Sequence, residues 1–225
     1  MYNFNKVIQK QEEENNFFVM HGLYGRSLVF KQQQKKEQAL EDLEKCFSLI
    51  GNPTVFSAYI YRKVCCEIGE FYFSEDNFEK ALDFFNKALK SFSFEENKES
   101  KEERVAIIKM MIACYVLLDQ YENALMHSKI GLSYKDDPFF HGKIIMCTKN
   151  LTEARFYAEK ILKNFPNSVD LHYYYALSLR DSGDYEKAWQ ELLVCFKCDP
   201  EFEPAKLVLE DFNSRINGGR TANSL

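Results

Sequence analysis

The sequence predicts an all-α protein built from repeated helix–turn–helix units, and the stretch Ser168–Pro200 contains one complete unit. Leu171 and Leu179 recur at helical spacing in its first half, and Ala188 and Leu192 recur in its second half. Two helices of this length cannot bury both of their apolar faces alone, so the unit requires neighbours. Weaker copies of the same pattern upstream supply those neighbours.

Polar residues separate and end the two helices of this unit. Within Asp181–Asp184, Gly183 suits the end of the first helix and Asp184 suits the cap of the second. Asp199-Pro200 then closes the second helix, because the residue before a proline is biased away from the helical conformation. The stretch therefore reads as helix, turn, helix and stop.

A turn followed by an alanine marks each of the expected units. The reference alanines are Ala39, Ala81, Ala124, Ala154 and Ala188, with Ala39 in the weakest copy. Only the last interval has the period of about 34 residues that is usual for one class of helical repeat. The first two intervals are longer and the third is shorter.

The unequal intervals have local explanations. Extra polar residues at Gly51–Thr54 and Glu95–Glu103 predict either extended loops or additional exposed helical turns. Pro138 is tolerated only in the first turn of a helix, so it predicts that the first helix of the fourth unit starts late and is about one turn short.

The residue at which the two helices of a unit cross is expected to be small. In the first to fifth units the candidates are Ser27, Gly69, Ile112, Gly142 and Ala176. Ile112 departs from this rule, which makes the packing of the third unit harder to predict.

The two ends of the chain differ from the repeats. Apolar residues at helical spacing over Glu203–Ile216 predict a helix that caps the array, and Asn217-Gly218-Gly219 predicts its end. We expect residues 1–16 to form a flexible extension and residues 218–225 a disordered tail.

The turn Gly183–Ala188, the small residue Ala176 and the closing Pro200 resemble the tetratricopeptide repeat. The resemblance covers roughly residues 17–217 and implies one elongated right-handed α-solenoid of about five helical hairpins. The expected units are residues 17–50, 55–94, 103–134, 137–166 and 168–200, followed by a cap helix at 203–217.

Composition narrows the class of partner. The net charge of −5 and the pI near 5.5 argue against nucleic acid, whose protein surfaces carry a basic excess. The apolar run Val105–Leu118 contains Lys109 and is shorter than the roughly 20 residues that span a bilayer. The first residues show neither a secretory signal nor a mitochondrial presequence, so we expect a cytoplasmic protein without a membrane span.

No constellation of residues predicts catalysis, a metal or a cofactor. Cys195 and Cys198 have the spacing of a redox or zinc motif, but no second pair of ligands completes it. The four histidines fall in different units without a metalloprotease spacing, and Gly22 and Gly25 lack the strand that precedes a phosphate-binding turn. We therefore expect a protein that is not an enzyme.

In tetratricopeptide arrays the first helix of each unit lines a concave groove, so the resemblance implies a partner-binding face. Aromatic residues and separated charges on that face suit an extended or helical peptide, although some of them could instead pack against neighbouring repeats. The candidate groove residues are Tyr24, Lys63, Phe73, Lys109, Phe139, Lys143, Tyr173 and Arg180.

These observations predict a non-enzymatic scaffold or adaptor that is a subunit of a protein assembly. The alternative is a chaperone or targeting co-factor that binds peptide tails transiently. The subgroup that grips a C-terminal carboxylate uses a lysine and an asparagine where this chain has Tyr24 and Leu28, or Cys66 and Glu70. Glu70 would repel a carboxylate, so that clamp is not expected.

Overall fold

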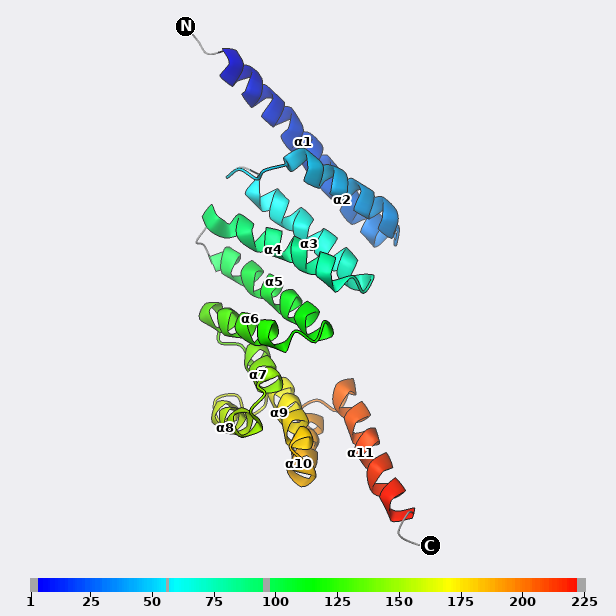
Figure 1. The fold of residues 1–225 in the computed structure, drawn as a ribbon. Coiled ribbons are helices and arrows are strands. Elements are labelled where there is room, and N and C mark those ends of the chain that lie inside the picture. The colour runs from blue at the N-terminus through cyan, green and yellow to red at the C-terminus, as the bar shows by residue number, and fades with distance from the viewer. Residues whose placement is uncertain (1–3, 56, 95–97, 222–225) are drawn as a thin grey trace. The chain divides into compact units, whose positions relative to one another are not determined.

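The structure is a computed structural model that describes residues 4–55, 57–94 and 98–221 (Figure 1). These residues form α-helices and one short 3₁₀ helix, with no strand among them, which confirms the all-α helical-repeat class. The helices are α1 (Phe4–Gln32), α2 (Lys36–Ile50), α3 (Ala58–Ser74), α4 (Phe78–Lys90), the 3₁₀ helix η1 (Ser91–Phe94), α5 (Lys98–Leu117), α6 (Tyr121–Tyr134), α7 (Pro138–Cys147), α8 (Leu151–Leu162), α9 (Val169–Asp181), α10 (Tyr185–Cys198) and α11 (Glu203–Thr221).

The chain divides into two compact units, which we call unit 1 (Met1–Gln120) and unit 2 (Tyr121–Leu225). The sequence predicts one continuous domain over residues 17–217, whereas the division falls in the turn between α5 and α6, inside the third expected repeat. The reference alanines do not signal this division, because they mark repeats on both sides of it.

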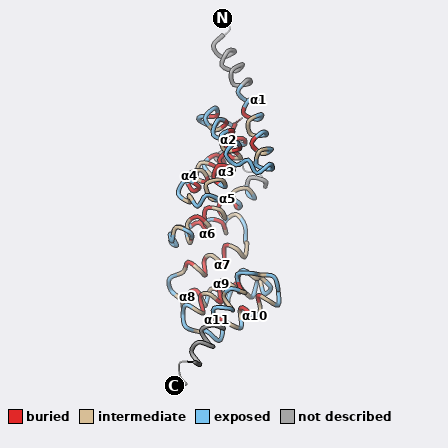
Figure 2. Tube along the Cα trace, turned by 90° about the vertical axis from the view of Figure 1, so that its right-hand side faces the viewer, coloured by how far each residue is buried: buried red, intermediate tan, exposed pale blue. Residues whose placement is uncertain are grey.

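Unit 1 has a core formed by successive helices. Helix α1 packs on α2, α3 packs on α4, and α4 also packs on α5. The large side chains of Val64, Ile68, Phe85 and Met111 are fully buried in this core. Figure 2 shows buried residues on these helices, and α3 is buried or half-buried along almost its whole length.

Unit 2 has a second core with its own members. Helix α9 packs on α7, α8 and α10, and α7 also packs on α6. Ile145, Leu171, Leu179 and Leu192 lie at the centre of this core, and Phe212 of α11 packs against it. Each unit therefore buries a separate apolar cluster.

The predicted crossing residues are buried in both units. The buried set comprises the five reference alanines together with Ser27, Gly69, Ile112, Gly142 and Ala176. At Gly69, an added Cβ would lie 2.7 Å from a ring carbon of Phe85, which shows why a side chain is excluded there. Ile112 is completely buried, so the third crossing position accepts a large residue inside the core.

The repeated turns share one backbone geometry. Gln34, Asp76, Asp119 and Gly183 all have positive φ angles between 55° and 82°. Each directly precedes the residue before the next helix, and Asp184 caps α10 by accepting a hydrogen bond from the Lys187 amide at 3.4 Å. The turn is therefore conserved in shape although only the last copy uses glycine, the residue best suited to that conformation.

Pro138 acts as predicted. It occupies the first turn of α7, which has 10 residues against 13 in α9. The carboxylate of Asp137 accepts a hydrogen bond from the Phe139 amide at 3.0 Å and so caps the shortened helix. In the earlier insert, α5 begins at Lys98, so residues from 98 to 103 form additional helical turns, and residues 95–97 lie outside the described part.

Both ends of the chain are more helical than the sequence predicts. Helix α1 begins at Phe4, within the stretch 1–16 that was expected to be flexible, and α11 runs to Thr221, past Gly218 and Gly219. Residues 1–3 and 222–225 lie outside the described part. Among the described helices, none combines the length and apolar character needed to cross a membrane.

Candidate functional site

Unit 1 contains a cavity of about 230 Å³ between its first-helix elements α1, α3 and α5. Tyr24 lines it from α1, and Lys63 and Cys66 line it from α3. Glu103 and Met110 complete the wall from α5. The cavity thus brings together Tyr24 and Lys63, two of the residues that the repeat register predicts for a partner-binding groove.

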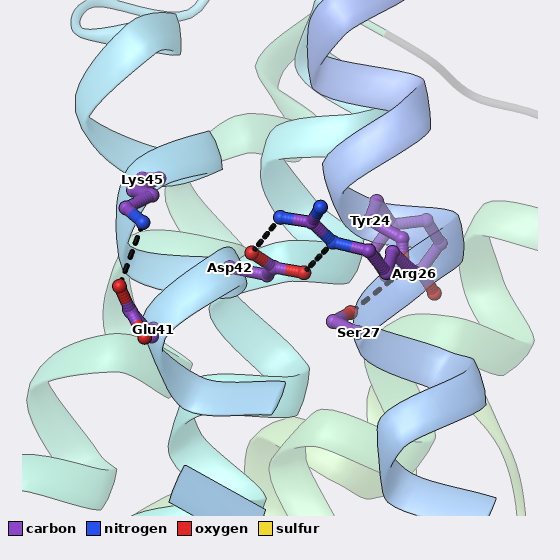
Figure 3. Close-up of polar contacts among 6 residues, drawn as sticks. All are labelled: Tyr24, Arg26, Ser27, Glu41, Asp42 and Lys45. Carbon is purple, nitrogen blue, oxygen red and sulfur yellow. Dashed lines mark hydrogen bonds and ion pairs between the residues drawn. The ribbon is translucent and has the colours of Figure 1, made fainter. Parts of the chain in front are cut away.

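A paired arginine and aspartate fix α1 against α2 near Tyr24 (Figure 3). Arg26 donates two hydrogen bonds to Asp42, from Nε to Oδ2 at 2.6 Å and from Nη2 to Oδ1 at 2.7 Å. The hydrogen bonds from Arg26 lower the pKa of the Asp42 carboxyl, which is almost fully buried. Such a bidentate pair has a fixed geometry, so it orients the helix that carries Tyr24.

Lys31 connects α1 to two acids on α3. Its ammonium lies 2.6 Å from Glu67 Oε2 and 2.9 Å from Glu70 Oε2. Both acids line the cavity. Although burial alone would lower it, the pKa of Lys31 is raised because both carboxylates accept hydrogen bonds from the ammonium.

Glu103 of α5 joins two cations of α3, and all three residues line the cavity. Lys63 Nζ lies 2.6 Å from Glu103 Oε1, and Arg62 Nε lies 2.7 Å from Glu103 Oε2. Burial would raise the pKa of the Glu103 carboxyl, but hydrogen bonds from Lys63 and Arg62 outweigh it and lower that pKa. The guanidinium of Arg62 is buried and also lies 4.1 Å from the ring centre of Phe92.

Uncharged groups form the rest of the cavity. Phe85 and Ile107 are core residues that reach its surface, and Ala106 and Met110 lie on α5 beside them. Burial raises the pKa of the Cys66 thiol to about 12, and burial is also the largest cause of the raised pKa of Tyr24. Both groups therefore remain neutral at physiological pH.

In unit 2, Lys143 of α7 lies among aromatic rings. Its ammonium is 4.4 Å from the ring centre of Tyr174 and 5.4 Å from that of Phe139, and it donates a hydrogen bond to the Tyr174 hydroxyl. Among the described residues, no carboxylate lies within ion-pair distance of this ammonium. Burial lowers the pKa of Lys143, because removal from water disfavours the charged form.

The remaining predicted groove residues have other surroundings. Tyr173 packs edge to face against Tyr174 and Phe202, with ring centres 5.3 and 5.4 Å apart. Arg180 pairs with its neighbour Asp181 at 2.8 Å. Phe73 packs on Phe78 near the end of α3, and Lys109 is half-buried on α5; neither lines the cavity.

Sequence reasoning missed three residues that shape these sites, namely Glu67, Glu103 and Tyr174. Glu67 and Glu103 form ion pairs with lysines that are distant in the sequence. Helical periodicity alone therefore does not identify them. Tyr174 had a usable signal, because it lies next to the candidate Tyr173 on α9.

Two buried histidines occupy equivalent places in unit 2, each in the first turn of a first helix. His141 of α7 contacts the Tyr157 hydroxyl at 2.6 Å and Asp136 Oδ1 at 2.7 Å. His172 of α9 places Nδ1 2.6 Å from Glu191 Oε2 and Nε2 2.9 Å from the carbonyl oxygen of Pro166. Since both partners of His172 only accept hydrogen bonds, both are satisfied only when its ring is protonated on both nitrogens.

The cysteine pair considered for a metal or redox role has two different environments. Cys195 is buried and directs its thiol to the carbonyl oxygen of Val169 at 3.5 Å, whereas Cys198 is exposed. Over the described ranges, no group of three or more histidine, cysteine or acidic side chains is arranged to hold a metal ion.

Comparison with known families identifies repeats in both units. Models of the tetratricopeptide repeat match residues 21–53 and 63–92 in unit 1 and residues 157–190 in unit 2. No curated protein matches the chain by sequence.

Solved structures share the fold at low sequence identity. YrrB, described as a tetratricopeptide repeat protein with an unusual peptide-binding site, is 20% identical, with 92% of this chain and 98% of YrrB covered and a TM-score of 0.58. MamA from Desulfovibrio magneticus is 13% identical, with 82% of this chain and 97% of the MamA chain covered and a TM-score of 0.62. The apo form of RapI is 12% identical, with 82% of this chain and 71% of the RapI chain covered and a TM-score of 0.65.

Proposed function

Because this chain is a tetratricopeptide repeat protein, we propose that it is a non-enzymatic scaffold or adaptor in a protein assembly. Tetratricopeptide repeats serve in general as surfaces for protein–protein interaction, and their stacked helices expose extended concave faces. In this proposal the first helices of the repeats bind an extended or helical segment of a partner protein in the cytoplasm.

The cavity of unit 1 is the observation that supports this proposal most directly. It lies on the first-helix elements α1, α3 and α5 and combines an apolar floor with a polar rim. Concave sites with a mostly apolar lining and a few placed polar groups are the usual form of binding sites. Tyr24 and Lys63 are the proposed contact residues in unit 1, and Phe139, Lys143 and Tyr173 are proposed in unit 2.

The remaining candidate groove residues are proposed as peripheral contacts. Arg180 and Lys109 lie on first helices but are already engaged within the chain, and Phe73 packs on Phe78. We expect their substitution to weaken partner binding less than substitution of Tyr24, because residues at the edge of an interface contribute less than buried central ones.

Co-purification tests the scaffold proposal. The tagged protein is isolated from its native cells under gentle conditions, and mass spectrometry identifies what remains bound. We expect a defined set of partners with the natural chain and with the control Tyr185→Ala, whose ring is exposed on α10. Tyr24→Ala should lose them. A natural chain that elutes alone at the mass of its monomer would contradict the proposal.

A transient co-factor that binds acidic peptide tails is the second candidate, and Lys143 favours it. Its half-buried ammonium has aromatic neighbours but no carboxylate partner among the described residues. Fluorescence anisotropy with acidic C-terminal peptides tests this candidate. Saturable binding that Lys143→Ala abolishes would support it over the stable scaffold, and absence of binding would exclude it.

A further inference from the structure

The charges around the unit 1 cavity neutralise one another. The three carboxylates of Glu67, Glu70 and Glu103 pair with the three cations of Lys31, Arg62 and Lys63 at distances from 2.6 to 2.9 Å. Five of these six residues line the cavity, and the sixth, Lys31, holds the two acids of α3. Each of these charged side chains therefore already has an opposite charge within the chain.

The floor below this rim is apolar. Phe85 and Ile107 belong to the buried core, and Ala106 and Met110 extend the same surface along α5. Burying an apolar side chain against such a floor contributes about 25 cal/mol for each Å² removed from water. Burying a new charge instead would remove it from water without a free partner, or would separate an existing pair.

The Tyr24 hydroxyl is a polar group of the cavity that an uncharged ligand can contact. The hydroxyl of Tyr24 has no hydrogen-bond partner among the described side chains and main-chain groups, although the carbonyl of this residue accepts from Ser27. A neutral phenol both donates and accepts hydrogen bonds. It can therefore contact a main-chain amide beside a partner's buried side chain.

We propose that the unit 1 cavity takes an uncharged aromatic or aliphatic side chain of a partner protein, with the adjoining peptide group contacting the Tyr24 hydroxyl. The proposal rests on the scaffold function and adds the chemistry of the partner's anchor residue. It excludes acidic and basic anchor residues from this cavity, because the ion pairs around it disfavour a charged side chain.

Three small indole compounds that differ in charge test the proposal on the full-length protein. The probes are neutral N-acetyl-tryptophanamide, anionic indole-3-acetate and cationic tryptamine. Binding is followed by the NMR shift of the ¹³C-labelled methyl group of Met110. We expect saturable binding of the neutral probe and at least about tenfold weaker binding of both charged probes, the ratio that 1.4 kcal/mol produces.

Two variants locate the binding. Ala106 is exposed at the cavity wall, so Ala106→Phe should fill the cavity without disturbing the core and should abolish binding of the neutral probe. Glu102→Phe places the same ring at an exposed position of α5 outside the cavity and should leave binding unchanged. Equal or tighter binding of a charged probe, or full binding to Ala106→Phe, would overturn the proposal.

Co-purification with the same variants separates this proposal from the scaffold function. If partners are retained by Ala106→Phe, the anchor proposal fails while the scaffold function stands. If the neutral probe binds as expected but the natural chain has no partners, the scaffold function fails and the chemical preference of the cavity stands.

Discussion

The first helices of unit 1 and unit 2 carry lysines at equivalent faces, but they balance these charges differently. In unit 1, Lys63 pairs with Glu103 and Lys31 pairs with Glu67 and Glu70. In unit 2, Lys143 rests against the rings of Tyr174 and Phe139 instead of a carboxylate. The same repeat can therefore place a lysine in a direct ion pair in one unit and against aromatic rings in the other, where Asp170 interacts with it only electrostatically.

From this difference we propose that the two units favour different partner chemistry. The neutral cavity favours an apolar anchor, because its rim pairs are complete before a partner arrives. The ammonium of Lys143 donates one hydrogen bond to the Tyr174 hydroxyl and has further N–H donors, so it suits a carboxylate or a main-chain carbonyl of a partner. In this proposal recognition depends on residues that vary between repeats, while the residues that define the repeat build the helices that carry them.

The largest expected effect tests whether the two cores are independent. Ala81 and Ala188 are completely buried, in the cores of unit 1 and unit 2 respectively. Ala81→Glu and Ala188→Glu each place an unpaired charge in a helix crossing and should each cost several kcal/mol of stability, on the order of 3–5 kcal/mol. Hydrogen exchange should show lost protection mainly in the unit that carries the substitution.

Ala106→Glu is the matched control for these two variants, because Ala106 is exposed. Its melting temperature should stay close to that of the natural chain. Unaltered melting of Ala188→Glu would contradict the assigned repeat register, and equal loss of protection throughout both units would contradict independent cores.

An intermediate effect should distinguish the two lysine sites. Glu103→Gln removes the carboxylate that pairs with the buried Arg62 and should destabilise unit 1 by about 1–3 kcal/mol, because a buried charge then loses its counter-charge. Lys143→Met breaks no ion pair among the described residues and should change stability less. Urea unfolding measures the stability of both variants. A larger loss of stability for Lys143→Met than for Glu103→Gln would contradict the comparison of the two lysine sites.

The smallest expected effect concerns pH and unit 2. Burial lowers the pKa of His172, but its hydrogen bonds to Glu191 and the Pro166 carbonyl outweigh burial and raise that pKa above 6.5. The folded state therefore holds the proton more tightly than the unfolded state. This stabilisation is complete below pH 6.5 and is lost as the pH rises through the folded pKa.

Urea midpoints measured from about pH 5.5 to 8.5 should follow this direction. The urea midpoint of the natural chain should exceed that of His172→Asn most at the acidic end of the range. The difference between the two midpoints should narrow toward the alkaline end. Glu191→Gln, which keeps a hydrogen-bond acceptor but removes the charge, should flatten this dependence. A difference that widens as the pH rises would contradict a doubly protonated His172 ring that donates to Glu191 and to the Pro166 carbonyl.

Local sequence features were sufficient for much of the fold. The spacing of Ala81 and Ala188 predicted buried crossing positions, and Pro138 predicted a shortened helix. These features depend on contacts within one turn or one hairpin, where helical period and the missing amide of proline act directly. The ends of α1 and α11 were less predictable, because helix ends depend on many weak preferences.

The candidate site was predictable only in part. The repeat register identified Tyr24, Lys63 and Lys143 as residues of first helices. It did not show that Lys63 would pair with Glu103, because these residues lie 40 positions apart and meet only when α3 and α5 pack in the same unit. Nor did it show that Lys143 would lie close to two aromatic rings.

By itself, then, the sequence determined the helices, their turns and the small residues at their crossings, because these follow from local backbone and side-chain chemistry. The tertiary structure decided the division into two units, the ion pair between Arg26 and Asp42, and which charged or aromatic groups surround each lysine. The physical reason is that ion pairing and desolvation depend on distances between helices, and packing sets those distances.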